Sequence, residues 1–329
     1  MGRFNQEGRF MRVTAMLVAG LAVWCGVAGA AEARGAWFPQ AKYGVFIHFL
    51  GGGNDWSSQV DAFNAEAFAR QMKEAGAGYV ILTLGQNSGY YCSPNAAYSA
   101  YCGYEPGDRC SKRDLPMDLI NALGKHNIRL MLYLPSRAPQ ADANAMARLG
   151  DVHEQQPAPQ EFTKRWSEVI REWSLRYGKN VHGWWFDGSY NTAGWDDLEK
   201  PYNWSTWAAA CRAGNPDSVL AFNPGTDLQK AFSRLTKEQD YTAGEQNVFT
   251  ALPRQFPAPE GMVWHILAHL GTRWAKADGP QHPDQAMIDY IRTVNAQGGV
   301  VSIEVAIDGS GAVYAPHFAQ LKAIAAALR

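Results

Sequence analysis

The stretch VHGWWFDG, residues 181–188, is mostly apolar from Val181 to Phe186 and then presents one carboxylate, Asp187, followed by Gly188. Apolar runs of this length are typical of strands buried on both faces of a parallel sheet. An acid directly after such a strand either begins a turn or is held at the strand tip for chemistry. The pattern of the whole chain decides between these two interpretations.

Seven further segments show the character of a strand, and helical patterns separate most of them. The other predicted strands lie at 43–49, 78–85, 128–135, 218–225, 239–245, 262–271 and 299–309. The predicted helices lie at 65–76, 116–127, 160–178, 205–214, 227–234, 284–297 and 315–328. Eight strand–helix units predict an α/β fold, a (β/α)8 TIM-type barrel in a single domain. The competing doubly wound sheet calls for a glycine-rich phosphate turn, and GGGN at 51–54 lacks that spacing.

The first thirty residues have the pattern of a cleavable secretory signal. They combine a basic start, an apolar stretch over about 13–27 and small residues at the end. The apolar stretch is shorter than the roughly 20 residues that span a membrane. We therefore predict a signal peptide at 1–30, a barrel domain at 31–329 and export to the periplasm or the medium.

Charge and composition narrow the class of partner. The chain carries 30 basic and 31 acidic residues, and loss of residues 1–30 removes three Arg and one Glu, which leaves a formal charge of −3. The sequence has no cluster of basic residues of the kind that binds nucleic acid. It also has no basic amphipathic helix of the kind that binds a membrane surface. The 12 Trp and 14 Tyr are many for this length and favour a carbohydrate as the partner. The oligomeric state stays open.

Four cysteines remain once the signal is removed: Cys92, Cys102, Cys110 and Cys211. In an exported chain we expect disulfides, and four cysteines allow three pairings among which the sequence does not choose. The spacing is unlike that of a zinc site. We predict neither a metal nor a cofactor.

Polar side chains follow several of the predicted strands. His48 lies near the end of the first strand, Asp187 ends the fourth and Asn223 the fifth, Glu245 ends the sixth, and Glu304 lies in the eighth. The carboxyl ends of all the strands of a barrel lie at one face, and the active sites of barrel enzymes are found at that face. Two carboxylates across a pocket suit glycoside hydrolysis, in which one attacks the anomeric carbon and the other protonates the leaving oxygen.

Other residues are candidates for sugar binding. Gln86 and Asn87 follow the second strand and either bond sugar hydroxyls or cap a helix. Trp56, after GGGND, is a candidate stacking platform. Trp185 and Trp264 are expected as apolar walls of the substrate site, where they would raise the pKa of the protonated acid.

Five stretches, in order along the chain, resemble the α-L-fucosidases of glycoside hydrolase family 29. AKYGVFIHF (41–49) resembles the opening K-x-G-I-F-I-H-W-G of that family. FNAEAFARQMKEAGAGYVILTLGQNSGYYC (63–92) resembles its next strand and loop, and WWFDG (184–188) its nucleophile strand. DYTAGEQ (240–246) resembles the segment that carries the acid/base Glu in several members, and VNAQGGVVSIEVAIDGSG (294–311) resembles the last strand.

The resemblance implies a retaining mechanism without a cofactor. Asp187 matches the nucleophile, Glu245 the acid/base, and His48 a histidine that contacts the sugar. The β-sandwich that usually follows the barrel in this family is expected to be absent.

The chain also departs from the family pattern. Gln86 and Asn87 replace a pair of histidines that contact fucose, Glu304 replaces an asparagine, and Trp264-His265 stands where many members have Trp-Glu. These departures keep two alternatives open, a glycosidase with a different glycone and a carbohydrate-binding barrel without turnover.

Overall fold

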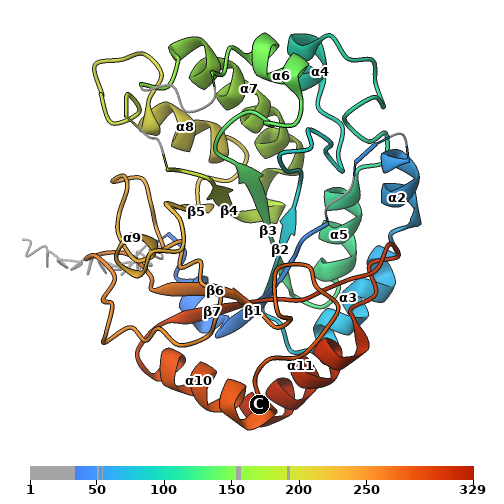
Figure 1. Ribbon diagram of the computed structural model, residues 1–329, viewed down its shortest axis with the longest axis vertical. Coiled ribbons are helices and arrows are strands. Elements are labelled where there is room, and N and C mark those ends of the chain that lie inside the picture. Colours follow the sequence, from blue (N-terminus) through green and yellow to red (C-terminus); the bar gives the residue numbers. More distant parts are fainter. Residues whose placement is uncertain (1–33, 50–51, 54, 153–156, 191–192) are drawn as a thin grey trace, which may run out of the picture. The chain divides into compact units, whose positions relative to one another are not determined.

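Parallel strands form one sheet at the centre of the fold (Figure 1). The computed structural model describes residues 34–49, 52–53, 55–152, 157–190 and 193–329. The strands in these residues are β1 (Tyr43–Ile47), β2 (Tyr79–Thr83), β3 (Arg129–Pro135), β4 (Val181–Asp187), β5 (Val219–Phe222), β6 (His265–His269) and β7 (Val300–Glu304). Their order is β5-β4-β3-β2-β1-β7-β6, with every neighbouring pair parallel. The predicted α/β class is confirmed, and this curled sheet is consistent with a TIM-like barrel.

One predicted strand, the segment 239–245, does not form. It makes only isolated bridge pairs, at Tyr241 and at Glu245. Gly244 explains the interruption, because its φ of +65° lies outside the extended region. A side chain there would also place its Cβ 1.9 Å from the carbonyl oxygen of His265, so this close approach of two backbones requires glycine.

The same segment nevertheless bonds to both edge strands of the sheet. The N–H of Asp240 donates to the carbonyl of Leu220 in β5 over 2.9 Å. The N–H of Leu267 in β6 donates to the carbonyl of Gly244, also over 2.9 Å. An irregular segment therefore joins β5 and β6 where a sixth barrel strand would lie.

The helices lie around the sheet, with α5 against β3 and α10 against β7 (Figure 1). They are α1 (Trp37–Gln40), α2 (Trp56–Ala62), α3 (Ala65–Glu74), α4 (Ala96–Cys102), α5 (Leu115–Gly124), α6 (Ala143–Leu149), α7 (Gln160–Tyr177), α8 (Trp204–Cys211), α9 (Leu228–Ala231), α10 (Asp284–Ala296) and α11 (Ala315–Leu328), with a 3-10 turn at Gly178–Asn180. The helices α3, α5 and α7 to α11 correspond to predicted segments. The others have at most seven residues, too few turns for a helical period to show in the sequence.

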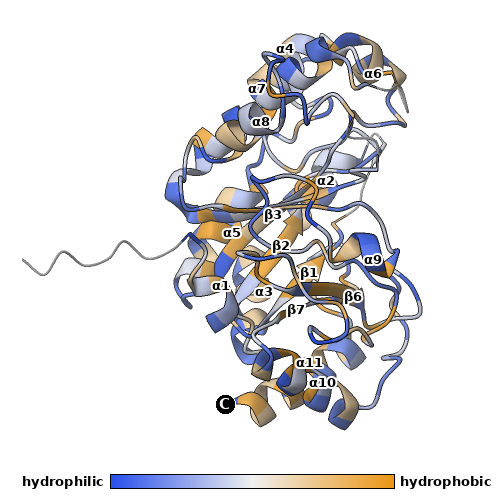
Figure 2. Ribbon diagram, turned by 90° about the vertical axis from the view of Figure 1, so that its left-hand side faces the viewer, coloured by the Kyte–Doolittle hydropathy of each residue, from blue (hydrophilic) through white to orange (hydrophobic). Residues whose placement is uncertain are grey.

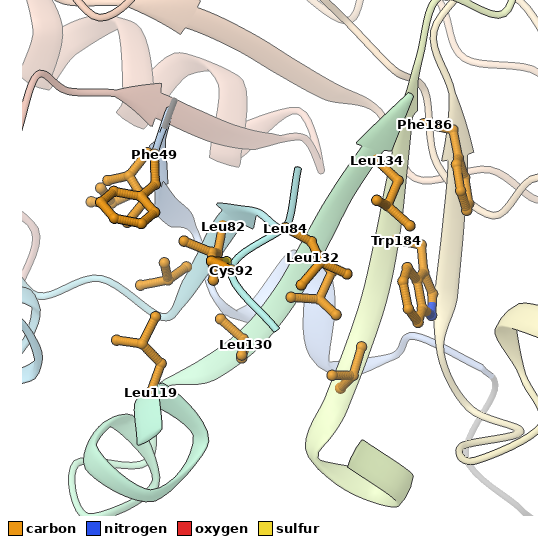
Figure 3. Packing of buried hydrophobic residues seen from close by; sticks show 14 of the residues in the cluster. Phe49, Leu82, Leu84, Cys92, Leu119, Leu130, Leu132, Leu134, Trp184 and Phe186 are labelled. Carbon is orange, nitrogen blue, oxygen red and sulfur yellow. The ribbon is translucent and has the colours of Figure 1, made fainter. Parts of the chain in front are cut away.

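Alternate strand residues face two separate apolar cores, as the two-residue period of a strand requires. The inner core consists of Phe38, Phe46, Tyr79, Ile81, Met131, Tyr133, Trp185, Val219, Ala221, Tyr241, Ala243, Leu267 and Val300. In β3, Met131 and Tyr133 face this inner core, whereas Leu130 and Leu132 face the outer core under the helices. Figure 3 shows outward residues of β2, β3 and β4 together with Leu119 of α5. The strands are strongly apolar, and the helices carry both kinds of residue (Figure 2).

The predicted disulfides do not form. Cys92, Cys102, Cys110 and Cys211 are free thiols, all of them buried in the outer core. Burial raises the pKa of the Cys102 thiol to about 12, which keeps it protonated at neutral pH. These cysteines act as small apolar packing groups, a role that only the tertiary contacts reveal.

The predicted signal peptide and the start of the barrel domain at residue 31 lie outside the described residues. Among the helices that are described, none is both long and apolar enough to cross a membrane.

Gly44→Ala is expected to destabilise the protein by about 1–3 kcal/mol. A Cβ at this position in β1 would lie 2.4 Å from the ring of Tyr79, whose hydroxyl is bonded to Ser302 over 2.7 Å and so resists displacement. Urea unfolding would show a lower midpoint at an unchanged slope. Gly124→Ala, at the end of α5, is the matched control, because no atom lies within 4 Å of the added methyl group. Equal midpoints for the two variants would contradict this account of the inner core.

Candidate active site

Asp187 is the last residue of β4, and three donors surround its carboxylate. The hydroxyl of Tyr133 donates to Oδ2 over 2.6 Å. The side-chain amide of Asn223 and the backbone N–H of Gly188 donate to Oδ1 over 2.9 and 2.8 Å. These three hydrogen bonds fix the orientation of the carboxylate at the strand tip.

Asn223 follows β5 and links Asp187 to a second carboxylate. Its Nδ2 also donates to Glu245 Oε2 over 2.5 Å. Its Oδ1 accepts from the N–H of Gly225 over 3.1 Å, which turns the NH2 group toward both acids. The two acceptor oxygens share one nitrogen and, by the sum of the two bond lengths, are no more than about 5.5 Å apart.

Glu245 holds a proton more tightly than a glutamate in water does. Burial and the negative charge of Asp187 raise the pKa of Glu245 to about 7, although the hydrogen bond from Asn223 and the charge of His48 act in the opposite direction. Glu245 can therefore hold a proton near neutral pH, as the acid of a carboxylate pair must.

A cavity of about 180 Å³ opens at these carboxylates. It is lined by Phe46, His48, Gln86, Tyr133, Trp185, Asp187, Glu245, Leu267 and Trp274. The ring of Trp185 stacks on Tyr133 with centroids 5.4 Å apart, and its Nε1 donates to the carbonyl of Ala243 over 3.1 Å. Aromatic walls around a few polar groups are typical of small-ligand sites. In the described part of the chain, no group of three or more His, Cys, Asp or Glu side chains is arranged to hold a metal ion.

Glu304 is placed to hold His48 rather than a sugar. The Nδ1–H of His48 and the N–H of Ala275 donate to Glu304 Oε1 over 3.1 and 2.7 Å. Glu304 is fully buried and does not line the cavity, and its Oε2 has no partner among the described residues. This corrects the prediction that Glu304 binds substrate. The bond to Nδ1 fixes the imidazole tautomer and leaves Nε2 of His48 for the cavity.

The two polar residues after β2 have different positions. Gln86 lines the cavity, and its Nε2 donates to the hydroxyl of Tyr133 over 3.0 Å. Asn87 is exposed and is not part of the lining; its carbonyl accepts from the N–H of Ala141 over 2.9 Å. Only Gln86 is therefore placed where the sequence predicted a contact with sugar hydroxyls.

Two predicted tryptophans lie away from the cavity. Trp56 begins α2 and is buried against Phe49, with ring centroids 5.2 Å apart. Trp264 comes just before β6, at the end of that strand opposite the carboxylates, and stacks on Phe232 with centroids 4.8 Å apart. Neither lines the cavity, which corrects the prediction that both contact substrate.

Four cavity residues were not predicted: the apolar Phe46 and Leu267, and Tyr133 and Trp274. Tyr133 is the one residue with a polar tip in the second half of β3, and it pairs in register with Trp185, so its position could have been inferred from strand alignment. Trp274 lies in the loop after β6, 5.4 Å from the ring of His48. No periodic pattern marks that loop, so the sequence carries no signal for Trp274.

Comparisons with known proteins give the family of this chain and the likeness of its fold. The sequence model of the alpha-L-fucosidase family matches residues 53–329. No curated protein sequence matches the chain. The solved structure of the endo-fucoidan hydrolase P5AFcnA, from glycoside hydrolase family 107, has a TM-score of 0.70 at 17% identity, covering 90% of this chain and 93% of that one.

Two solved fucosidases share the fold as well. Alpha-L-fucosidase AlfC from Lactobacillus casei has a TM-score of 0.61 at 17% identity, with 89% of this chain and 97% of that chain covered. A family 29 alpha-L-fucosidase from Bacteroides thetaiotaomicron has a TM-score of 0.61 at 17% identity, with 88% and 71% covered. Identities this low show likeness of fold alone.

Because the pKa of Glu245 is raised, we expect the free energy of unfolding to be lower at high pH, where Glu245 is ionised. Because the folded state binds this proton more tightly than the unfolded state, the stability that it contributes declines as the pH rises from about 4.5 to 7. Glu245→Gln keeps an acceptor for Asn223 without the charge. We expect the variant and the wild type to be similar near pH 4.5, and the variant to be more stable at pH 8 by up to roughly 3 kcal/mol.

Chemical denaturation at both pH values measures this difference. Glu199→Gln, at an exposed glutamate, is the control and should follow the wild type at both. If the free energies of unfolding of Glu245→Gln and the wild type differ by the same amount at both pH values, Glu245 is not buried beside a charge.

Proposed function

Because this chain belongs to the alpha-L-fucosidase family and is a glycoside hydrolase, we propose that it works by retention, with Asp187 as nucleophile and Glu245 as acid/base. One observation carries the proposal: a single amide nitrogen, Nδ2 of Asn223, donates to both carboxylates. That contact keeps one oxygen of each acid within about 5.5 Å of the other, which favours the close pair of a retaining enzyme over the separation of about 6.5–9.5 Å that inversion needs to admit water.

The proposed reaction has two steps. Asp187 attacks the anomeric carbon, the bond from that carbon to the leaving oxygen breaks, and Glu245 transfers its proton to that oxygen. Glu245, now a carboxylate, takes a proton from water as the water attacks the glycosyl ester and frees Asp187. The pKa of about 7 suits a group that must give a proton in one step and accept one in the next.

The hydrogen bonds suggest which oxygen of Asp187 attacks. Oδ1 accepts from Asn223 and Gly188, whereas Tyr133 is the one donor to Oδ2 among the residues that the structure describes. Oδ2 thus keeps more lone-pair capacity for the anomeric carbon, with the Tyr133 hydroxyl holding it in place.

An α-L-fucosyl unit is the proposed glycone. The matching family and the solved structures of the same fold are named for fucosides or fucoidan. His48 and Gln86 are the polar cavity residues that would meet its hydroxyls. A different glycone is the second candidate, because Asn87 lies off the cavity and leaves Gln86 alone in the place of the family's two histidines.

Two further proposals concern the whole chain. The signal-like pattern of residues 1–30 supports export, to the periplasm or the medium. The bonds of segment 239–245 to β5 and β6 support an eightfold barrel in which this segment takes the sixth place.

Asp187→Ala is expected to lower kcat/KM on 4-nitrophenyl α-L-fucoside by at least about a thousandfold, because the covalent step is lost. Azide should restore turnover and give the glycosyl azide of inverted configuration, which NMR of the product identifies. Asp289→Ala, on the exposed surface of α10, is the control and should retain full activity. A product of retained configuration would rule out Asp187 as the nucleophile, and turnover of another glycoside in a panel would replace fucose as the glycone.

The titration of Glu245 should appear in the pH profile. We expect kcat/KM of the wild type to fall above about pH 7, where the acid form is lost. In Glu245→Ala, kcat/KM should not fall above pH 7. The variant should lose far more activity on substrates with poor leaving groups than on the nitrophenyl substrate. Azide should rescue this variant with retained configuration. Equal losses on good and poor leaving groups would assign the proton transfer to another residue.

A further inference from the structure

Tyr190 is exposed beside the two carboxylates. It comes three residues after Asp187, and 64% of its surface is exposed. That fraction is the highest among the large hydrophobic side chains of the described residues. An aromatic ring left in water forgoes the stabilisation of burial, so its place on the rim calls for a reason other than folding.

The Tyr190 ring lies over two glycines that support the carboxylates. A Cβ at Gly225 would be 3.2 Å from its Cε1, and one at Gly188 would be 3.8 Å from its Cε2. Gly188 follows Asp187 directly, and the N–H of Gly225 orients the Asn223 amide. The ring therefore lies on the backbone that holds the acids, and a methyl group at Gly225 would crowd it.

Electrostatics support the same placement. Partial burial of the phenol, followed by the negative charges of Asp187 and Glu245, raises the pKa of Tyr190 to about 12. The hydroxyl is thus near enough to both acids to respond to their charge and remains a neutral donor at neutral pH. Tyr190 is nevertheless not among the residues that line the glycone cavity, so it is available to a group outside that cavity.

Two further exposed apolar side chains come after the elements next to β4. Leu228 and Val248 are 37% and 39% exposed, and they follow Asn223 by five residues and Glu245 by three. β4 pairs with β5, and β5 is bonded to segment 239–245, so these residues follow consecutive elements around the sheet.

We propose that Tyr190 is the stacking platform of a subsite for the leaving group, which takes a sugar ring or another flat or ring-shaped aglycone. The inference rests on the proposed function, because the acid/base must meet the leaving oxygen and the leaving group must then lie on the side of Glu245, outside the glycone cavity. The apolar C–H face of a sugar ring packs on an aromatic face, and the Tyr190 hydroxyl adds a donor at the edge.

This assignment predicts a loss that depends on the leaving group. A substrate with a ring as its leaving group uses the platform, whereas a glycosyl fluoride has nothing to place there. Hydrolysis of the glycosyl ester by water does not use it either. Tyr190 is therefore a specificity residue and does not support the attack of Asp187.

The experiment compares kcat/KM of the wild type, Tyr190→Ala and Tyr190→Phe on 4-nitrophenyl α-L-fucoside and on α-L-fucosyl fluoride. We expect Tyr190→Ala to lose about tenfold on the nitrophenyl substrate, as a stacking contact of about 1.4 kcal/mol predicts, and to stay within twofold on the fluoride. Tyr190→Phe should keep most of the activity on both. Leu175→Ala, at an exposed leucine on α7, is the control and should change neither.

Equal losses on both substrates would overturn the inference and make Tyr190 a support for Asp187. No loss on either would overturn it as well. If the wild type turns over neither compound, both the proposed function and this inference fail. If the wild type is active and only the expected effect of Tyr190→Ala is missing, the inference alone fails.

Discussion

The amide of Asn223 is the contact on which the site depends. Two carboxylates this close repel one another, and one NH2 group relieves that repulsion by donating to both. Asn223 is placed by the sheet itself, because its backbone N–H donates to the carbonyl of Phe186 over 2.8 Å and so extends the pairing of β4 with β5. Burial and the charge of Asp187 raise the pKa of Glu245, and the hydrogen bond from Asn223 opposes that rise.

Glu245 lies at the end of segment 239–245, which is irregular where a regular barrel would have a strand. The left-handed φ at Gly244 breaks the extended conformation, and the missing side chain lets this backbone approach His265 closely. His265 itself is structural, because its Nε2 is bonded to the Ser302 hydroxyl over 2.8 Å and burial lowers its pKa to about 4. The Tyr79 hydroxyl is also bonded to Ser302, over 2.7 Å, so these three buried polar side chains are paired.

Much of this arrangement could be predicted from residue order. Apolar runs separated by helical patterns gave a parallel sheet, and parallel strands bring their carboxyl ends to one edge. That rule alone placed Asp187, Asn223, Glu245 and His48 together, although they are up to about two hundred residues apart in the chain. Their chemical types then narrowed the reaction, since a pair of acids at a strand edge suits glycoside hydrolysis.

The order of residues did not predict which side chains would lie close together in space. Trp264 and Trp274 are ten residues apart in the chain, yet only Trp274 lines the cavity, because one precedes β6 and the other follows it. Glu304 turned out to hold His48, and Tyr190 emerged as exposed, only once the loops were packed. The sequence by itself determined the periodicity of the strands, their direction and hence the edge that carries the acids. The tertiary structure decided which side chains meet there, because contacts between distant segments depend on register and packing, which local patterns do not encode.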